Sequence, residues 1–199
     1  MSSLADSEKQ LLLEVARRAL ILAVERRESL LDFPAHPALH RPGGAFVTLR
    51  LRRQLRGCIG QFASNDPLVH VVAYCARAAA LEDPRFDPVS LIELSQIEIE
   101  ISVLSPPQQI FADQIEIGTH GVVVSRGRQR GVLLPQVALE LNLTAARFLE
   151  ETCLKAGLER NAWTDPATQI QAFTAEVFSE ADFRAAAEAR PDPGYSSST

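Results

Sequence analysis

Strict alternation of residue types over 97–103 limits what this chain can fold into more than any other pattern. Apolar and polar side chains alternate there, in the order Ile97, Glu98, Ile99, Glu100, Ile101, Ser102 and Val103. A period of two places each kind of side chain on its own face of a β-strand. The fold must therefore contain a sheet with one apolar face.

The other segments mix helices and strands. Strands are expected over 45–53, 122–125, 131–134 and 170–177, and 54–60 is expected to form a turn and a second short strand. A first helix is expected from Ser7, which is spaced from Gln10 as in a capping box, to a point before Phe33. Further helices are expected over 67–83, 89–94, 135–141, 144–157 and 179–189. The order lacks strict β-α-β alternation, which favours an α+β fold with a mixed, mostly antiparallel sheet and flanking helices.

Length and composition narrow the class of protein. The 199 residues are expected to form one domain over 5–189 and a disordered tail over 190–199. The net charge of −5 argues against a nucleic-acid binder that uses its whole surface, although a local basic groove stays open. No signal peptide and no apolar run of about 20 residues is present, so we expect a cytoplasmic protein without a membrane span.

Cysteine usage fits a reducing compartment. Cys58, Cys75 and Cys153 form no CxxC pair, so neither a zinc ribbon nor a thioredoxin-like site is supported, and no metal or cofactor is expected. Cys75 and Cys153 lie on apolar helical stripes and are expected to pack in the core.

The strongest candidate for a functional site is the turn formed by residues 56–60, Arg-Gly-Cys-Ile-Gly. Glycines on both sides of Cys58 allow backbone or a ligand to approach the thiol closely. Arg56 is two residues away along an extended chain and is expected on the same face, where its guanidinium would favour the reactive thiolate. The alternative is that Cys58 is a small buried side chain in a tight pair of strands.

Three further groups carry candidate chemistry. His120 lies in a turn between strands, where it could act as a general base or be an exposed polar residue. Asp83 and Arg85 could pair with each other, or Arg85 could hold an anionic substrate. Arginines at 50, 52, 53 and 56, and again at 126, 128 and 130, could bind nucleic acid, or they could pair across strands with acidic residues such as Glu98 and Glu100.

Residues 55–60, Leu-Arg-Gly-Cys-Ile-Gly, resemble the AMMECR-type domain family, whose bacterial members are called AmmeMemoRadiSam system protein A. The similarity spans about 11–177 and continues through several blocks, at 83–86, 93–94, 101–105, 118–121, 133–137 and 153–158. The chain departs from the family pattern at Leu81, Leu143 and Cys75, where many members have Phe, Trp and Asn.

The resemblance implies a larger and a smaller lobe, with the cysteine motif near a cleft between them. It also implies a shared pathway with a Memo-like protein and a radical-SAM protein. Residues of the matching blocks become candidates for substrate binding: Gly57, Gly60, Asp83, Arg85, Pro135 and Gln136.

Three functional hypotheses follow. The first is a thiol-dependent enzyme or enzyme subunit, with Cys58 as nucleophile or ligand, Arg56 as its activator and His120 as a base. The second is a non-catalytic module that docks onto the Memo-like or the radical-SAM protein. The third is a nucleic-acid binder that uses the arginine runs.

Overall fold

The structure is a computed structural model that describes residues 3–27, 31–62 and 64–188. It has the α+β fold expected from the sequence. The described residues divide into two compact units, which we call the Cys58 unit (within 3–102 and 177–188) and the His120 unit (103–176). The tail expected over 190–199 lies outside the described residues, and the cleft implied between two lobes stays a prediction.

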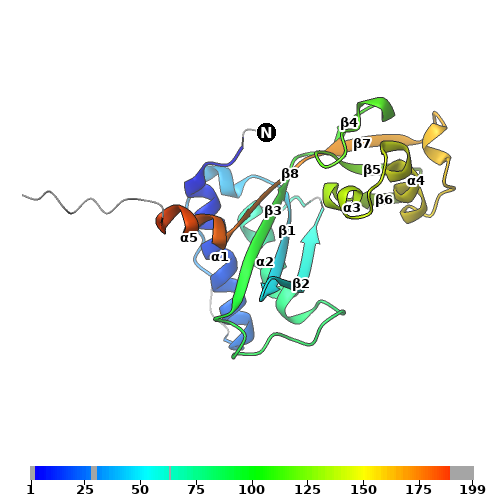
Figure 1. Cartoon of the computed structure of the whole chain (residues 1–199). Coiled ribbons are helices and arrows are strands. Elements are labelled where there is room, and N and C mark those ends of the chain that lie inside the picture. Colours follow the sequence, from blue (N-terminus) through cyan, green and yellow to red (C-terminus); the bar gives the residue numbers. More distant parts are fainter. Residues whose placement is uncertain (1–2, 28–30, 63, 189–199) are drawn as a thin grey trace, which may run out of the picture. The chain divides into compact units, whose positions relative to one another are not determined.

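The Cys58 unit is built on a four-stranded sheet in the order β2-β1-β3-β8 (Figure 1). The strands are β1 (Gly44–Leu51), β2 (Gln54–Gln61), β3 (Ile97–Leu104) and β8 (Ala175–Ser179). The helices are α1 (Asp6–Val24), α2 (Leu68–Leu81) and α5 (Glu180–Glu188). Helix α2 packs on β1 and β2, and α1 packs on α2, so α2 is the helix that covers the strand with the cysteine motif.

The core of this unit follows the two periodicities of the sequence. Ile99 and Ile101 of β3 are fully buried while Glu98 and Glu100 stay partly exposed, which confirms the alternation. On β1, Val47 and Leu49 are fully buried. Helix α2 is buried on most of its surface because it packs on β1 and β2 and also on α1, and its buried residues include Val69, Val72, Cys75, Ala76 and Ala79.

The His120 unit contains the second four-stranded sheet, in the order β4-β7-β5-β6. Its strands are β4 (Gln108–Gln109), β5 (Gly121–Arg126), β6 (Gln129–Leu133) and β7 (Gln169–Phe173). They pair antiparallel, and the predicted hairpin is formed by β5 and β6. Helices α3 (Pro135–Glu140) and α4 (Ala145–Lys155) follow, and α4 packs on the hairpin with Phe148, Leu149 and Cys153 buried.

Short one-turn helices complete the described elements. They are η1 (Pro37–His40), η2 (Ala112–Gln114) and η3 (Ala162–Thr164). The predicted cap at Thr144 is confirmed, since its hydroxyl accepts a hydrogen bond from the Arg147 amide at 3.4 Å.

Three predicted elements are wrong or displaced. The helix expected over 89–94 is a series of turns, in which the Glu93 carboxylate binds the Ser90 amide at 2.8 Å. The strand expected over 170–177 is two strands, β7 and β8, which belong to different sheets. Helix α1 begins at Asp6, and its cap is a bond from the Ala5 amide to the Glu8 carboxylate at 2.7 Å rather than a Ser7–Gln10 box.

The hairpin between β1 and β2 turns on two arginines in the left-handed region. Arg52 has φ 52° and Arg53 has φ 67°. A non-glycine residue there costs about 1 kcal/mol. We expect Arg53→Gly to raise the free energy of unfolding by about 1 kcal/mol in urea denaturation. Arg128, in the other hairpin, has no positive φ, so Arg128→Gly is the control and should give no gain.

Candidate functional site

The cysteine motif occupies β2, an edge strand of its sheet, and Gly57 brings it against α2. A Cβ atom at Gly57 would lie 2.1 Å from the Ala79 carbonyl oxygen of α2. No side chain fits there, because the obstacle is backbone that cannot move aside without displacing the helix. Gly57 therefore has a packing role that accounts for it without a substrate.

We expect Gly57→Ala to destabilise the Cys58 unit by about 3 kcal/mol, since the added methyl group overpacks a backbone contact. Thermal or urea unfolding would measure this. Gly127→Ala is a comparison for steric crowding, because nothing lies within 4 Å of its Cβ position, although its φ of +60° carries a conformational cost of about 1 kcal/mol. A stability loss no larger than that of Gly127→Ala would contradict the close contact.

The main chain of Cys58 is clamped on both sides by the residues that follow α2. Its amide donates to the Asp83 carboxylate at 2.8 Å, and its carbonyl oxygen accepts from the Arg85 guanidinium at 3.2 Å. Asp83 and Arg85 bind each other through two hydrogen bonds of 2.9 and 2.7 Å, which confirms the expected pairing. These bonds occupy main-chain groups that an edge strand would otherwise leave open.

Asp83 is the buried member of this clamp. Its side chain is 2% exposed, against 54% for Arg85. The guanidinium of Arg85 holds the pKa of Asp83 well below its ordinary range, against the opposing effect of burial, and the Cys58 amide adds to the lowering. The carboxylate in turn raises the pKa of Arg85. The pair is therefore ionised at neutral pH.

The side chain of Cys58 faces away from α2, and Cys58 as a residue is half-buried. Alternation along β2 places it on the face opposite Gly57. Thr48 is its partner across the strand pair, and the Thr48 hydroxyl donates to Sγ at 3.3 Å. Next along this face, a Cβ at Gly60 would meet the Phe46 ring at 2.1 Å, so the ring covers the glycine.

Arg56 is engaged elsewhere. Its guanidinium binds the Glu93 carboxylate at 2.7 and 3.2 Å and the Asp87 carbonyl oxygen at 2.9 Å. The strand register jumps from Leu49–Gly57 to Arg50–Leu55, so Arg56 is the extra residue of a β-bulge, and the bulge interrupts the alternation that was expected to align it with Cys58. Arg85, not Arg56, is the guanidinium that contacts Cys58.

The Arg56–Glu93 pair is a second fixed ion pair beside the motif. The guanidinium lowers the pKa of Glu93 from its ordinary value of 4.5 to about 2, and the Ser90 amide and hydroxyl contribute to the lowering while burial opposes it. Both side chains are largely buried. This pair ties the turn region after α2 to β2.

The other two cysteines are core residues, as expected. Cys75 on α2 and Cys153 on α4 are fully buried. Burial raises the pKa of the Cys75 thiol to about 11 and raises that of Cys153 as well. Neither thiol is exposed to a substrate, which leaves Cys58 as the accessible cysteine of the chain.

The remaining candidates belong to the His120 unit. His120 is half-buried, and its Nδ1 accepts a hydrogen bond from the Glu116 amide at 3.1 Å. Pro135 is buried in the first turn of α3, and the buried Oε1 of Gln136 has no hydrogen-bond partner among the described residues. The expected convergence of His120 with Cys58 and Arg56 stays a prediction.

The bond to Nδ1 changes the expected chemistry of His120. A ring nitrogen that accepts from a backbone amide carries no proton, so the neutral ring carries its proton on Nε2. Nε2 is then a donor, and the lone pair needed for a general base is already used. In this geometry His120 presents a donor at Nε2, and its role as a general base stays a prediction.

The chain is similar to known proteins over most of its length. The family model described as AMMECR1 matches residues 13–178. The chain belongs to the AMMECR1 family. A protein of Pyrococcus furiosus is 40% identical over 194 residues, covering 90% of this chain and 91% of its own. A protein of Nanoarchaeum equitans is 37% identical over 177 residues, covering 85% and 98%.

A solved structure is similar to this chain in fold. The crystal structure of an uncharacterized protein from Pyrococcus horikoshii has a TM-score of 0.78 and 37% sequence identity, and the match covers 89% of this chain and 93% of that one. The AMMECR1 domain therefore accounts for most of the chain.

The arginine runs of this AMMECR1 domain are partly paired. Arg50 binds Glu100 at 3.4 Å, as the cross-strand interpretation predicts, and Arg126 binds Asp165 at 3.1 Å. Arg52 contacts Gln96 at 3.4 Å, and Glu98 pairs with Arg184 instead. These bonds reduce the basic surface that nucleic acid could use.

Neither a metal-binding cluster nor a membrane-spanning helix is found among the described residues. No group of three or more His, Cys, Asp or Glu residues is placed to hold a metal ion among the described residues. No described helix is both long and apolar enough to cross a membrane.

Sequence reasoning missed two functional neighbours of Cys58. Thr48 lies within the strand expected over 45–53, and Glu93 lies within the family block at 93–94. Neither position by itself predicts a contact with the cysteine motif. The two-residue turn at 52–53 would by itself pair Thr48 with Gly57, and the bulge at Arg56 moves the partner to Cys58, so the turn alone could not have indicated Thr48. No local signal connects Glu93 to Arg56 across 37 residues.

Proposed function

We propose that this AMMECR1 domain is a thiol-dependent enzyme, or the thiol-bearing subunit of one, with Cys58 as its reactive group. One observation carries the proposal: both main-chain groups of Cys58 are bound by the Asp83–Arg85 pair, while Cys58 as a residue is only half-buried. A reactive side chain on a rigid, fully bonded backbone is the arrangement that catalytic positioning requires.

Two neighbours support this role. The Thr48 hydroxyl donates to Sγ, and such a bond stabilises negative charge on the sulfur when a thiolate forms. Arg85 has an exposed side chain, and its Nη1 makes no described hydrogen bond. Arg85 can therefore hold a carboxylate or another anionic group of a substrate beside Cys58, a role that replaces Arg56 as the source of positive charge.

Covalent capture tests the proposal. The protein is incubated with the small-molecule fraction of a cell extract, and adducts on the peptide that contains Cys58 are identified by mass spectrometry. We expect an adduct on Cys58 and none in Cys58→Ser, with the unfolding temperature of the variant unchanged within about 2 °C. Thr48→Val, which removes only the hydroxyl donor, should slow the capture. Equal rates of capture by Thr48→Val and the wild type would show that the Thr48 hydroxyl does not assist the reaction.

A second candidate function is a docking module for the Memo-like protein that the family resemblance implies. Apolar side chains are exposed beside the Arg56–Glu93 pair: Leu91 is 62% exposed and Ile92 is 81% exposed. Neighbouring exposed apolar residues are typical of protein interfaces. Here Leu91→Ser with Ile92→Ser should abolish co-purification with the Memo-like protein, or with a radical-SAM partner, while Cys58→Ala should leave it intact. The opposite pattern would exclude this function.

A further inference from the structure

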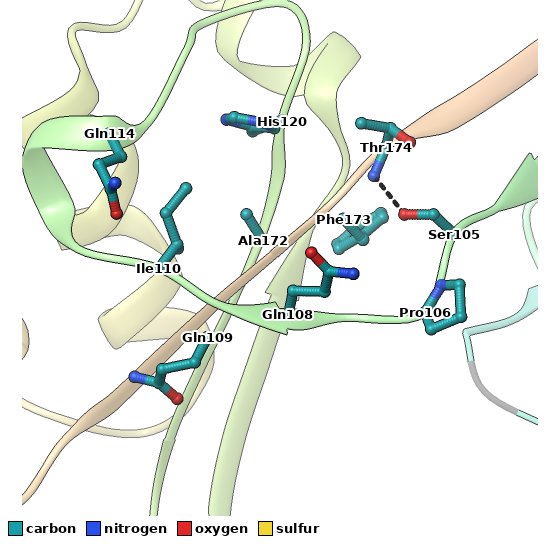
Figure 2. A pocket seen from close by; sticks show the side chains of 10 residues that line it. All are labelled: Ser105, Pro106, Gln108, Gln109, Ile110, Gln114, His120, Ala172, Phe173 and Thr174. Carbon is teal, nitrogen blue, oxygen red and sulfur yellow. Dashed lines mark hydrogen bonds between the residues drawn. The ribbon is translucent and has the colours of Figure 1, made fainter. Parts of the chain in front are cut away.

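A cavity of about 550 Å³ lies within the His120 unit (Figure 2). Ala172 and Phe173 of β7 form its buried floor, and Gln108 of β4 reaches into it. His120, which precedes β5, and Gln114, at the end of η2, line the other side. The volume is within the range of small-molecule sites, about 300–1,000 Å³.

Three side chains of this cavity have their acceptor atoms already bound by backbone amides. The Ser105 hydroxyl oxygen accepts from Thr174 at 2.9 Å, and Nδ1 of His120 accepts from Glu116 at 3.1 Å. Oε1 of Gln114 accepts from the Phe111 amide at 3.0 Å. The single lone pair of His120 Nδ1 is used, while the Ser105 and Gln114 oxygens each keep a second lone pair. The three side chains still offer donors to the cavity: the Ser105 hydroxyl, the Nε2 hydrogen of His120 and the side-chain amide of Gln114.

None of the described residues that line the cavity carries a formal charge. Its polar members are Ser, Thr, Gln and His, and its apolar members include Pro106, Ile110 and Phe173. An ionised ligand would lose hydration there without gaining a counter-charge, and this is unfavourable. An uncharged ligand that carries hydrogen-bond acceptors would satisfy the donors and place its apolar surface on the proline and isoleucine side chains.

We propose that this cavity is a binding site for an uncharged small molecule of the cyclic amide or ureide class. Carbonyl oxygens of such a ring accept from His120, Gln114 and Ser105. Gln108, whose side-chain amide carries a donor and an acceptor side by side, matches the N–H and C=O groups of the ring edge. The site is independent of the thiol, and binding should persist in Cys58→Ser.

Titration followed by ¹H–¹⁵N NMR tests the site with three probes. Hydantoin and 2-pyrrolidinone are neutral members of the class, and pyroglutamate is 2-pyrrolidinone with a carboxylate. We expect the neutral probes to shift the side-chain amide of Gln114 and the backbone amides of His120 and Gly121. Pyroglutamate should bind at least about tenfold more weakly than 2-pyrrolidinone.

Gln114→Glu keeps the acceptor for the Phe111 amide and removes the donor, so it should weaken binding of hydantoin about tenfold. The matched control is Gln54→Glu, on an exposed strand end of the other unit, which should bind as wild type does. If Gln114→Glu does not fold, His120→Phe repeats the test with a ring that lacks the donor. Absent shifts at the cavity, binding of pyroglutamate as tight as that of 2-pyrrolidinone, or full affinity in the folded Gln114 or His120 variant would each overturn the proposal.

Discussion

Replacing Asp83 with alanine should lower the free energy of unfolding of the Cys58 unit by about 3 kcal/mol. The substitution removes the acceptor of the Cys58 amide and the counter-ion of Arg85 at once. Loss of one partner of a buried pair costs about 3–5 kcal/mol, and the lower end applies because the Arg85 guanidinium can turn to water. Urea unfolding followed by circular dichroism would measure the change.

A neighbouring aspartate provides the control for Asp83→Ala. Asp87 is exposed, and only its carbonyl oxygen takes part in the contacts described above, so Asp87→Ala should change stability by no more than about 0.5 kcal/mol. Equal effects of the two substitutions would show that the clamp around Cys58 does not hold the unit together.

Acid should destabilise the Cys58 unit in a window set by Glu93. The pKa of Glu93 is lowered from 4.5 to about 2 in the folded chain. A lowered pKa means that the stabilisation is complete above the unfolded value and is lost as the pH falls from about 4.5 toward 2. The loss from this group is roughly 3 kcal/mol, and protonation of Asp83, whose pKa is also lowered, adds to the loss at the acid end.

The slope of stability against pH tests the ion pair directly. We expect Glu93→Gln to be less stable at neutral pH and to show a flatter dependence between pH 4.5 and 2. Glu82→Gln removes a partner of the exposed Arg77 and should keep the slope of the wild type, because surface ion pairs contribute little. An unchanged slope in Glu93→Gln would contradict the assignment of acid sensitivity to this pair.

Elements with a strong period could be predicted from the sequence. The alternation is confirmed over 97–101, where the isoleucines are buried and the glutamates partly exposed, whereas Ser102 is buried although it lies on the polar face. The apolar residues predicted to be buried on α2 are buried as well. The strand expected over 170–177 failed for a different reason. The segment carries strand-forming residues on both sides of Thr174, but the chain leaves one sheet and enters the other there, and this division depends on tertiary structure.

The sequence predicted where the candidate site lies, but it did not predict which side chains contact Cys58. The glycines around Cys58 indicated close packing, and Gly57 shows it against α2. The bulge at Arg56 depends on the register of β1 and β2, which residue types alone do not fix. The bulge turns Arg56 away from Cys58, and Arg85 contacts Cys58 instead. The spacing of residues in the sequence could not have predicted this change of partner.

The most direct test of the account is the alkylation rate of each cysteine, read by mass spectrometry in the folded protein and in urea. A clamped, accessible and activated thiol at Cys58 should react with iodoacetamide at pH 7 faster in the folded chain than in the unfolded one, while Cys75 and Cys153 should be protected by at least about a hundredfold. Slower reaction of Cys58 in the folded chain, comparable with the two buried thiols, would contradict a functional role for its sulfur.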